Sequence, residues 1–110
     1  MEDLKIYQKW EDMHLYLYGA LKSYPKSERF TLATTTINAS IEVGMSITRA
    51  NTSRDKKKWL DHADIELARL KILVRIGMKL GFLPINKYGI LSGMLTEIGR
   101  MFGGWIRSST

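Results

Sequence analysis

Lysine and arginine side chains at helical spacing offer the clearest chemistry in this sequence. Lys71, Arg75 and Lys79 recur every four residues, which places them on one face of a helix. Cations in such a line can bind successive phosphates of a nucleic-acid backbone, and the counterions released make that binding salt-dependent. Lys57 shares this sector, but carboxylates such as Asp61 lie in it too. The alternative is a solvated face with local Asp–Lys pairs, and periodicity alone does not separate the two.

A second basic line lies nearer the C-terminus, where Arg100 and Arg107 are seven residues apart on one helical face. The same face contains four small residues, Gly89, Gly93, Thr96 and Gly103. Glycine costs about 0.8–1 kcal/mol per helix-interior site relative to alanine, so this many glycines need a reason. Close approach of a neighbouring helix is the favoured reason, and close approach of a ligand or partner between the arginines is the other.

The positive charge lies almost entirely in the second half of the sequence. Residues 1–48 carry five Lys/Arg and six Asp/Glu, whereas residues 49–110 carry twelve and five, which together give the net +6 of the chain. This asymmetry favours a polyanion or an acidic protein surface as partner, with the first half as scaffold. The candidate nucleic-acid or partner-binding residues are Arg54, Lys56, Lys57, Lys58, Lys71, Arg75, Lys79, Arg100 and Arg107.

Residues for catalysis or metal binding are sparse. His62 and Glu66 are spaced i, i+4, yet no second histidine completes a metal site. The chain has no cysteine, which removes thiol nucleophiles, disulfides and zinc–thiolate sites. It also lacks a glycine-rich phosphate loop, a nucleophile elbow and a paired-carboxylate arrangement. We therefore expect a protein that is not an enzyme and that holds no metal and no cofactor.

Helices must position all of these residues. Apolar residues recur at helical spacing in four segments, residues 3–24, 28–50, 54–80 and 86–107. Short connections between them predict an all-α fold, an up-down antiparallel four-helix bundle in a single domain over residues 1–110. No stretch of 18 apolar residues and no signal peptide is visible, so we expect a cytoplasmic protein with no membrane partner.

Proline, glycine and capping residues mark the expected helix ends. Pro25 ends the first helix, and Gly81 follows the last turn of the third as a stop signal. The expected N-caps of the three later helices are Ser27, Thr52 or Ser53, and Asn86.

The third segment is apolar on two sides. One broad stripe contains Leu60, Ala63, Leu67, Leu70, Leu73, Val74 and Gly77. A second stripe of Ile65, Ile72 and Ile76 lies on nearly the opposite side, with Arg69 between the stripes. Two stripes indicate either deep burial or a subunit interface. We favour the interface, because a small bundle can hardly bury one helix all round, and we expect a homo-oligomer with Ile65, Arg69, Ile72 and Ile76 at its contact.

Several segments resemble a known family. Residues 24–32 (Tyr-Pro-Lys-Ser-Glu-Arg-Phe-Thr-Leu) are similar to the junction of the first two helices in a four-helix-bundle superfamily. This superfamily includes proteins encoded in 23S ribosomal RNA intervening sequences. Residues 67–75, 80–83 and 97–106 resemble, more narrowly, the accessory variability determinant (Avd) family, most specifically through Ile-Gly-Arg-x-x-Gly-Gly-Trp in the last segment. The intervening-sequence branch has a Pro-Ser-Asn-Ile-Ala-Glu-Gly-like string after its second helix, which residues 40–47 do not match.

The resemblance implies an accessory protein of a diversity-generating retroelement. In that family the protein forms a pentameric ring of four-helix bundles, binds nucleic acid and associates with the reverse transcriptase. The pair then supports mutagenic copying of template RNA into cDNA, followed by retrohoming. The implied partners are therefore a reverse transcriptase, RNA or DNA, and further copies of the chain. Two alternatives remain: a 23S rRNA intervening-sequence-type protein, and a helical oligomer that binds an acidic protein without nucleic acid.

Overall fold

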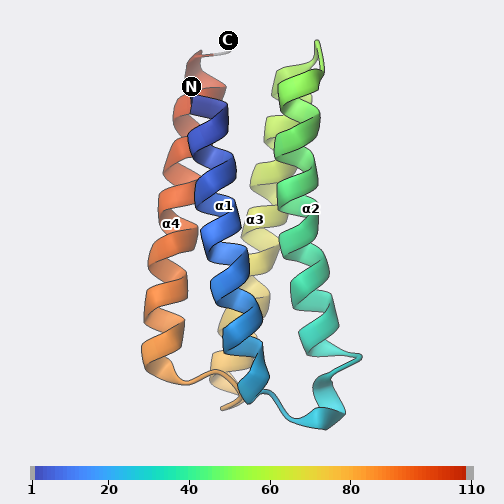
Figure 1. Ribbon diagram of the computed structural model, residues 1–110, viewed down its shortest axis with the longest axis vertical. Helices are drawn as coiled ribbons and strands as arrows, with labels where there is room; N and C mark the ends of the chain where they lie inside the picture. The colour runs from blue at the N-terminus through green and yellow to red at the C-terminus, as the bar shows by residue number, and fades with distance from the viewer. Residues whose placement is uncertain (1, 109–110) are drawn as a thin grey trace.

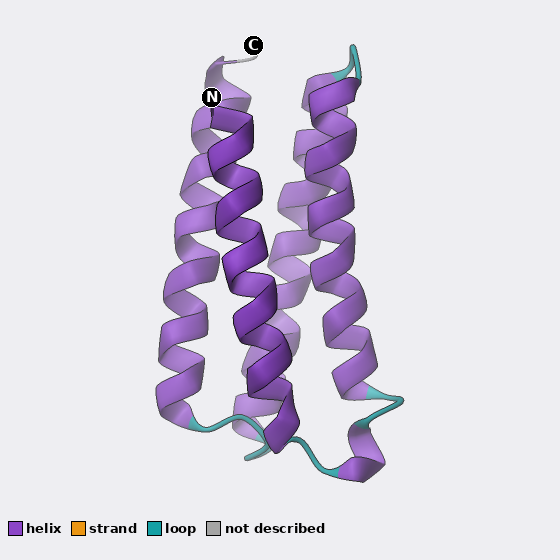
Figure 2. Cartoon of the chain, in the orientation of Figure 1, coloured by secondary structure: helices purple, strands orange, loops and turns teal. Residues whose placement is uncertain are grey.

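Residues 2–108, which the computed structural model describes with side chains from residue 5 onward, form four long α-helices (Figure 1). The helices are α1 (Glu2–Ala20), α2 (Leu32–Thr52), α3 (Lys56–Lys79) and α4 (Ile85–Ser108). Two short 3-10 helices, η1 (Leu21–Ser23) and η2 (Lys26–Glu28), lie between α1 and α2. This described range contains no strand (Figure 2). The expected all-α bundle is therefore confirmed.

Successive helices run in opposite directions, as Figure 1 shows. The α1–α2 connection and the α3–α4 turn lie at one end of the bundle, which we call the connection end. The α2–α3 turn, the start of α1 and the end of α4 lie at the other, the terminal end. Each helix packs against two neighbours, α1 and α3 both contacting α2 and α4. The bundle measures 42 × 24 × 18 Å.

The core is built from one apolar face of each helix. Its largest fully buried side chains include Met13, Leu17, Ile47, Leu67, Leu70, Leu95 and Phe102. The broad apolar stripe predicted for the third segment lies in this core, apart from Leu73, which is half-buried. On α2 the buried face consists mainly of small and polar residues such as Ala39, Ser40 and Gly44. Across the part of the chain that the structure describes, no helix is both long and apolar enough to cross a lipid bilayer.

The second helix begins later than the sequence suggested. Ser27 does not cap α2 but lies inside η2, whose turn is closed by a hydrogen bond from Glu28 N to Pro25 O (2.9 Å). α2 starts at Leu32 rather than at residue 28, and Thr31 before it makes no side-chain capping hydrogen bond. The chain uses these intervening residues to turn from α1 to α2, so they cannot extend the helix.

The N-cap of α3 also differs from the expectation. The carboxylate of Asp55 accepts a hydrogen bond from Lys58 N (3.2 Å) and caps the helix. Ser53 accepts one from Asp55 N (3.0 Å) and so positions the capping residue, while Thr52 ends α2. A carboxylate at this position also lies at the positive end of the helix dipole, which favours it over a hydroxyl. Asn86 lies within the first turn of α4 and is not its N-cap.

Gly81 ends α3 as predicted. Its φ of +81° lies in the left-handed region, where an L side chain is strained. Gly81 N donates to Met78 O (3.0 Å), and Phe82 N donates to Gly77 O (2.9 Å). These two hydrogen bonds form a Schellman motif, which satisfies the last carbonyls of the helix and reverses the chain toward α4.

Candidate nucleic-acid interface

The net positive charge of the chain is gathered at one end of the bundle. A division of each helix at its midpoint separates the connection end, residues 12–41 and 68–96, from the terminal end. The connection end contains eight Lys/Arg and two Asp/Glu, whereas the terminal end contains nine of each. The whole net charge of +6 therefore belongs to the connection end. The asymmetry that the sequence shows between its two halves becomes a separation of charge along the bundle axis.

Lys71, Arg75 and Lys79 form a basic line on α3 at the connection end. They are exposed, and they occupy successive turns of the helix. Residues 67–96 contain no Asp or Glu, and none of the three cations forms an ion pair with another residue of the described chain. The alternative of local Asp–Lys pairs therefore does not apply to this line.

A groove of about 200 Å³ runs between α3 and α4 beside the basic line. It is lined by Lys71, Tyr88, Ser92, Leu95 and Thr96. The Thr96 hydroxyl donates to Ser92 O (2.8 Å) and is not free as a donor. An ammonium group with hydroxyl groups beside it suits the oxygens of a phosphate.

The lysines at the start of α3 have other partners. Lys56 Nζ donates to Ala50 O (3.0 Å) and Asn51 O (3.3 Å), which satisfies carbonyls near the end of α2. Lys57 Nζ donates to Asp61 Oδ2 (2.9 Å), and this hydrogen bond raises the pKa of Lys57. Lys56 and Lys57 thus already bind groups of the chain itself at the terminal end.

Lys58 and Arg54 complete the cluster beside the α2–α3 turn. Lys58 Nζ lies 5.1 Å from the ring centroid of Trp59, and the guanidinium carbon of Arg49 lies 4.9 Å from it. Two cations thus approach this half-buried indole, which limits its use for stacking a base. Arg54 is exposed in the turn itself.

Arg100 and Arg107 lie in the terminal half of α4. Lys71 reaches the start of this half, since a Cβ added at Gly99 would lie 3.5 Å from Lys71 Nζ. A Cβ atom added at Gly89 or Gly93 would meet nothing within 4 Å. At Gly103 it would lie 3.3 Å from Arg107 Nη1. Close approach of a neighbouring helix therefore does not explain Gly89 and Gly93, because this face of α4 points away from the bundle. The other expectation, approach by a ligand or partner, stays a prediction.

The second apolar stripe of α3 is uncovered. Ile65 is 68% exposed, Ile72 61% and Ile76 41%. Arg69 beside them is exposed and pairs with Glu66 on its own helix (3.3 Å). Deep burial within the chain is therefore ruled out for this stripe, and the subunit interface remains the prediction.

Comparisons with known sequences and structures identify the family of this chain. The bAvd-like family model matches residues 4–109. The chain belongs to this family. Among solved structures, one similar protein is of unknown function and comes from the S23 ribosomal protein family of Bacteroides thetaiotaomicron. It has a TM-score of 0.86 over 97% of this chain and 99% of that chain, at 17% sequence identity, which shows a shared fold. No curated protein matches.

His62 takes part in a polar contact between α2 and α3 of this bAvd-like chain. Its Nε2 atom lies 3.1 Å from Glu42 Oε1, which also accepts a hydrogen bond from Arg49 (2.8 Å). The Arg49 hydrogen bond is the main reason that the pKa of Glu42 is lowered. These groups join α2 to α3. Over the described residues, no group of three or more His, Cys, Asp or Glu side chains is placed to hold a metal ion.

Four cations at the connection end were missed by the sequence reasoning: Lys22, Lys26, Arg29 and Lys87. The first three belong to the half of the sequence that we expected to be scaffold, and the structure places them at the same end as the basic line. Helical periodicity could not place these three, because they lie in or beside the 3-10 helices, where the helical period is broken. A usable signal was the clustering of three cations within eight residues around Pro25.

Proposed function

We propose that this bAvd-like protein is a non-enzymatic accessory subunit of a diversity-generating retroelement. It binds the element's reverse transcriptase and nucleic acid in the cytoplasm, and so supports mutagenic copying of template RNA into cDNA. The observation that carries the proposal is the concentration of the entire net charge at the connection end. There Lys71, Arg75 and Lys79 have no carboxylate partners among the described residues.

This charge distribution is suited to a polyanion. A patch of one sign gives a field that attracts counterions and speeds association. Each phosphate that replaces counterions at a lysine or arginine adds to affinity at low salt. Cations already paired within the fold, such as Lys57, would first have to give up their partner. We therefore assign the nucleic-acid contact to the connection end and not to the terminal end.

Assembly multiplies this field. We assign the uncovered face of α3, with Ile65, Ile72 and Ile76, to the contact with another copy of the chain. In a ring with cyclic symmetry, every subunit points the same way along the axis. The connection ends then form one basic rim, at which weak contacts from several subunits act together on one RNA.

The RNA contact is tested with two variants that remove the same charge. Lys71→Ala/Arg75→Ala/Lys79→Ala removes three cations at the connection end, and Arg54→Ala/Lys57→Ala/Lys58→Ala removes three at the terminal end. We expect the first to weaken binding of single-stranded RNA about tenfold or more and to lower the salt slope by about 2, and the second to retain most affinity. Equal losses would show that net charge, and not position, determines binding.

The reverse transcriptase is the partner that separates the proposal from its alternatives. We expect the protein to co-purify with the reverse transcriptase encoded beside it, near a template and variable repeat pair. A gene inside a ribosomal RNA operon would support the intervening-sequence-type function instead. Retention of an acidic protein with no RNA binding at low salt would support the purely protein-binding oligomer.

A further inference from the structure

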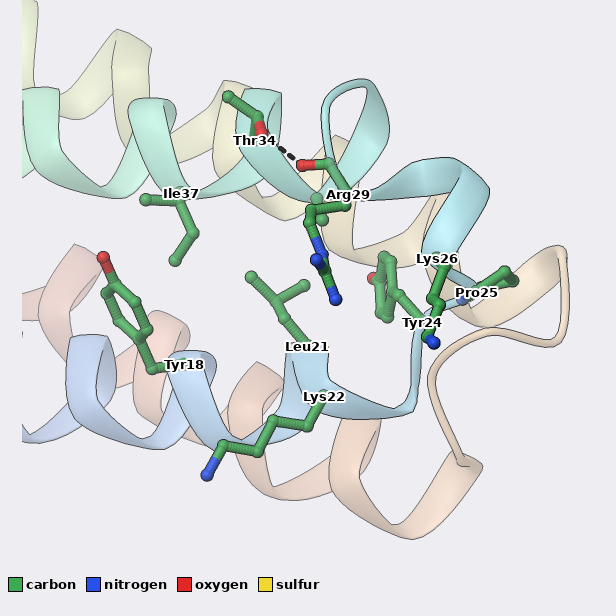
Figure 3. A pocket seen from close by; sticks show the side chains of 10 residues that line it. Tyr18, Leu21, Lys22, Tyr24, Pro25, Lys26, Arg29, Thr34 and Ile37 are labelled. Carbon is green, nitrogen blue, oxygen red and sulfur yellow. Dashed lines mark hydrogen bonds between the residues drawn. The ribbon is translucent and has the colours of Figure 1, made fainter.

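A second pocket opens between α1 and α2 at the connection end. Its volume is about 540 Å³, and its walls come from the end of α1, the two 3-10 helices and the first turns of α2. Leu21 and Ile37 supply apolar surface, and Arg29 projects into the space between the two helices (Figure 3). It shares no lining residue with the groove between α3 and α4. A cavity of this size is typical of those that hold small molecules.

Three cations and no carboxylate line this pocket. Arg29 and Lys26 lie beside Tyr24, whereas Lys22 extends along α1 and points away from Arg29 (Figure 3). None of the three cations forms an ion pair within the described part of the chain. Glu28 follows closely in the sequence, but it does not line the pocket and forms no ion pair with these cations in the described chain; its carboxylate accepts a hydrogen bond from the Thr31 hydroxyl (2.8 Å). Like charges brought together without a counter-charge favour an anionic ligand.

An aromatic ring is held at the other side of the pocket. Tyr18 packs edge to face against His14 (5.2 Å between centroids), and His14 stacks on Trp10 (4.9 Å). Trp10 is fixed in turn, because its Nε1 donates to Ser40 O on α2 (2.8 Å). This aromatic row holds the Tyr18 ring in place and leaves the residue 53% exposed. A held, exposed ring beside cations is the arrangement that single-stranded nucleic-acid sites use to stack bases.

The walls also limit the class of ligand. They are helical, so most of their backbone groups are already hydrogen-bonded and offer no strand edge with which an extended peptide could pair. What remains is apolar surface, the exposed ring of Tyr18, the largely buried ring of Tyr24 and three cations. A nucleotide matches this combination, since it joins a flat base to a phosphate.

We propose that this pocket binds one nucleotide of a single-stranded RNA, with its base against Tyr18 and its phosphate at Arg29 and Lys26. The inference rests on the proposed nucleic-acid function and adds a second RNA contact, on the side of the bundle formed by α1 and α2. The first half of the chain is then part of the binding surface.

The role of the pocket cations is tested by measuring the affinity of the protein for fluorescently labelled hexauridylate. Lys26→Ala/Arg29→Ala removes two pocket cations, and Lys5→Ala/Lys9→Ala removes two from α1 at the terminal end. We expect about a tenfold loss of affinity for the first and less than a twofold loss for the second. Losses of equal size in the two variants would overturn the site.

The ring is tested separately, because charge alone would not need it. We expect Tyr18→Ala to weaken hexauridylate binding about fivefold or more, and Tyr18→Phe to keep the affinity. Tyr7→Ala is the matched control, because it removes the ring at the other end of the same aromatic row, which packs on Trp10 (5.5 Å between centroids) and does not line the pocket. Equal effects of Tyr18→Ala and Tyr7→Ala would contradict base stacking. Displacement of the probe by hexaglutamate as readily as by unlabelled hexauridylate would contradict the nucleotide class.

The proposal for the pocket and the proposal for the α3 line can each be overturned without the other. If the three-cation variant on α3 loses RNA binding and the pocket variants do not, the pocket proposal is wrong and the proposed function stands. If only the pocket variants lose hexauridylate, the pocket proposal stands, and the α3 line is not the main RNA contact. If none of them changes RNA binding, both proposals are overturned.

Discussion

At the scale of single residues, one small set of contacts fixes α1 against α2. Gly44 on α2 leaves room for the indole of Trp10, since a Cβ there would lie 2.3 Å from Trp10 Cζ2. Ser40, one turn earlier, accepts the indole N–H at its carbonyl, and its hydroxyl lies 2.7 Å from His14 Nδ1. These contacts determine the position of the aromatic row that ends at Tyr18. The sequence shows their residue types but not their pairing, because the partners are 26 to 34 positions apart in the chain.

The environment of His14 predicts a pH dependence of stability. Burial lowers the pKa of His14 below its ordinary value of 6.5. Between that lowered pKa and 6.5 the unfolded chain binds the proton more readily, so the folded state is favoured above about pH 7 and loses stability as the pH falls. We expect His14→Gln, which cannot titrate, to reduce the fall in unfolding free energy between about pH 7.5 and 5.5.

Urea unfolding at the two pH values, at one protein concentration, measures this effect. His62→Gln is the control, because it removes the only other histidine. A fall in stability that is as steep in His14→Gln as in the parent would show that other groups cause it.

At the scale of elements, the apolar period predicted all four helices and the core face of α3. It did not predict the core face of α2, because residues such as Ala39, Ser40 and Gly44 are buried there and give no apolar period. Gly81 also predicted the end of α3, because its φ requires a glycine. The helix starts were less predictable. Asp55, Ser53 and Thr52 can all accept a capping hydrogen bond, and only the path of the turn decides which of them reaches the first free N–H groups. The basic end could not be predicted from the sequence either. Its charge gathers only because the antiparallel packing places residues 22–29 and 71–87 at the same end of the bundle.

The outward glycines of α4 give a prediction for that helix. Gly93→Ala places a methyl group in open space, so we expect unfolding free energy to rise by about 0.5–1 kcal/mol from helix propensity alone. Gly44→Ala, which clashes with Trp10, should lower it by about 1–3 kcal/mol. Chemical unfolding at fixed protein concentration compares the two. A loss of stability in Gly93→Ala would indicate that a second chain closely approaches this face of α4.

At the scale of the whole molecule, the bundle has two surfaces of different character. Its connection end carries the net charge, and the outer side of α3 carries an uncovered apolar stripe. If the stripe joins copies around a ring, the charge of about +6 per chain accumulates on one rim, to about +30 for five copies. RNA affinity and assembly should therefore be lost together when the stripe is disrupted.

The variant Ile72→Gln/Ile76→Gln tests this coupling, because an amide cannot be buried in an apolar contact without a hydrogen-bond partner, and it adds no charge beside Lys71, Arg75 and Lys79. We expect light scattering to give several times the chain mass of 12.6 kDa for the parent, five times if the proposed ring is a pentamer, and one chain mass for the variant. Leu15→Gln, at an exposed apolar residue of α1, should leave the mass unchanged. The monomeric variant keeps every cation assigned to RNA, yet its affinity should fall, since only one subunit contacts each strand. A parent mass of one chain would overturn the interface, and a monomeric variant with full affinity would show that assembly does not contribute to RNA binding.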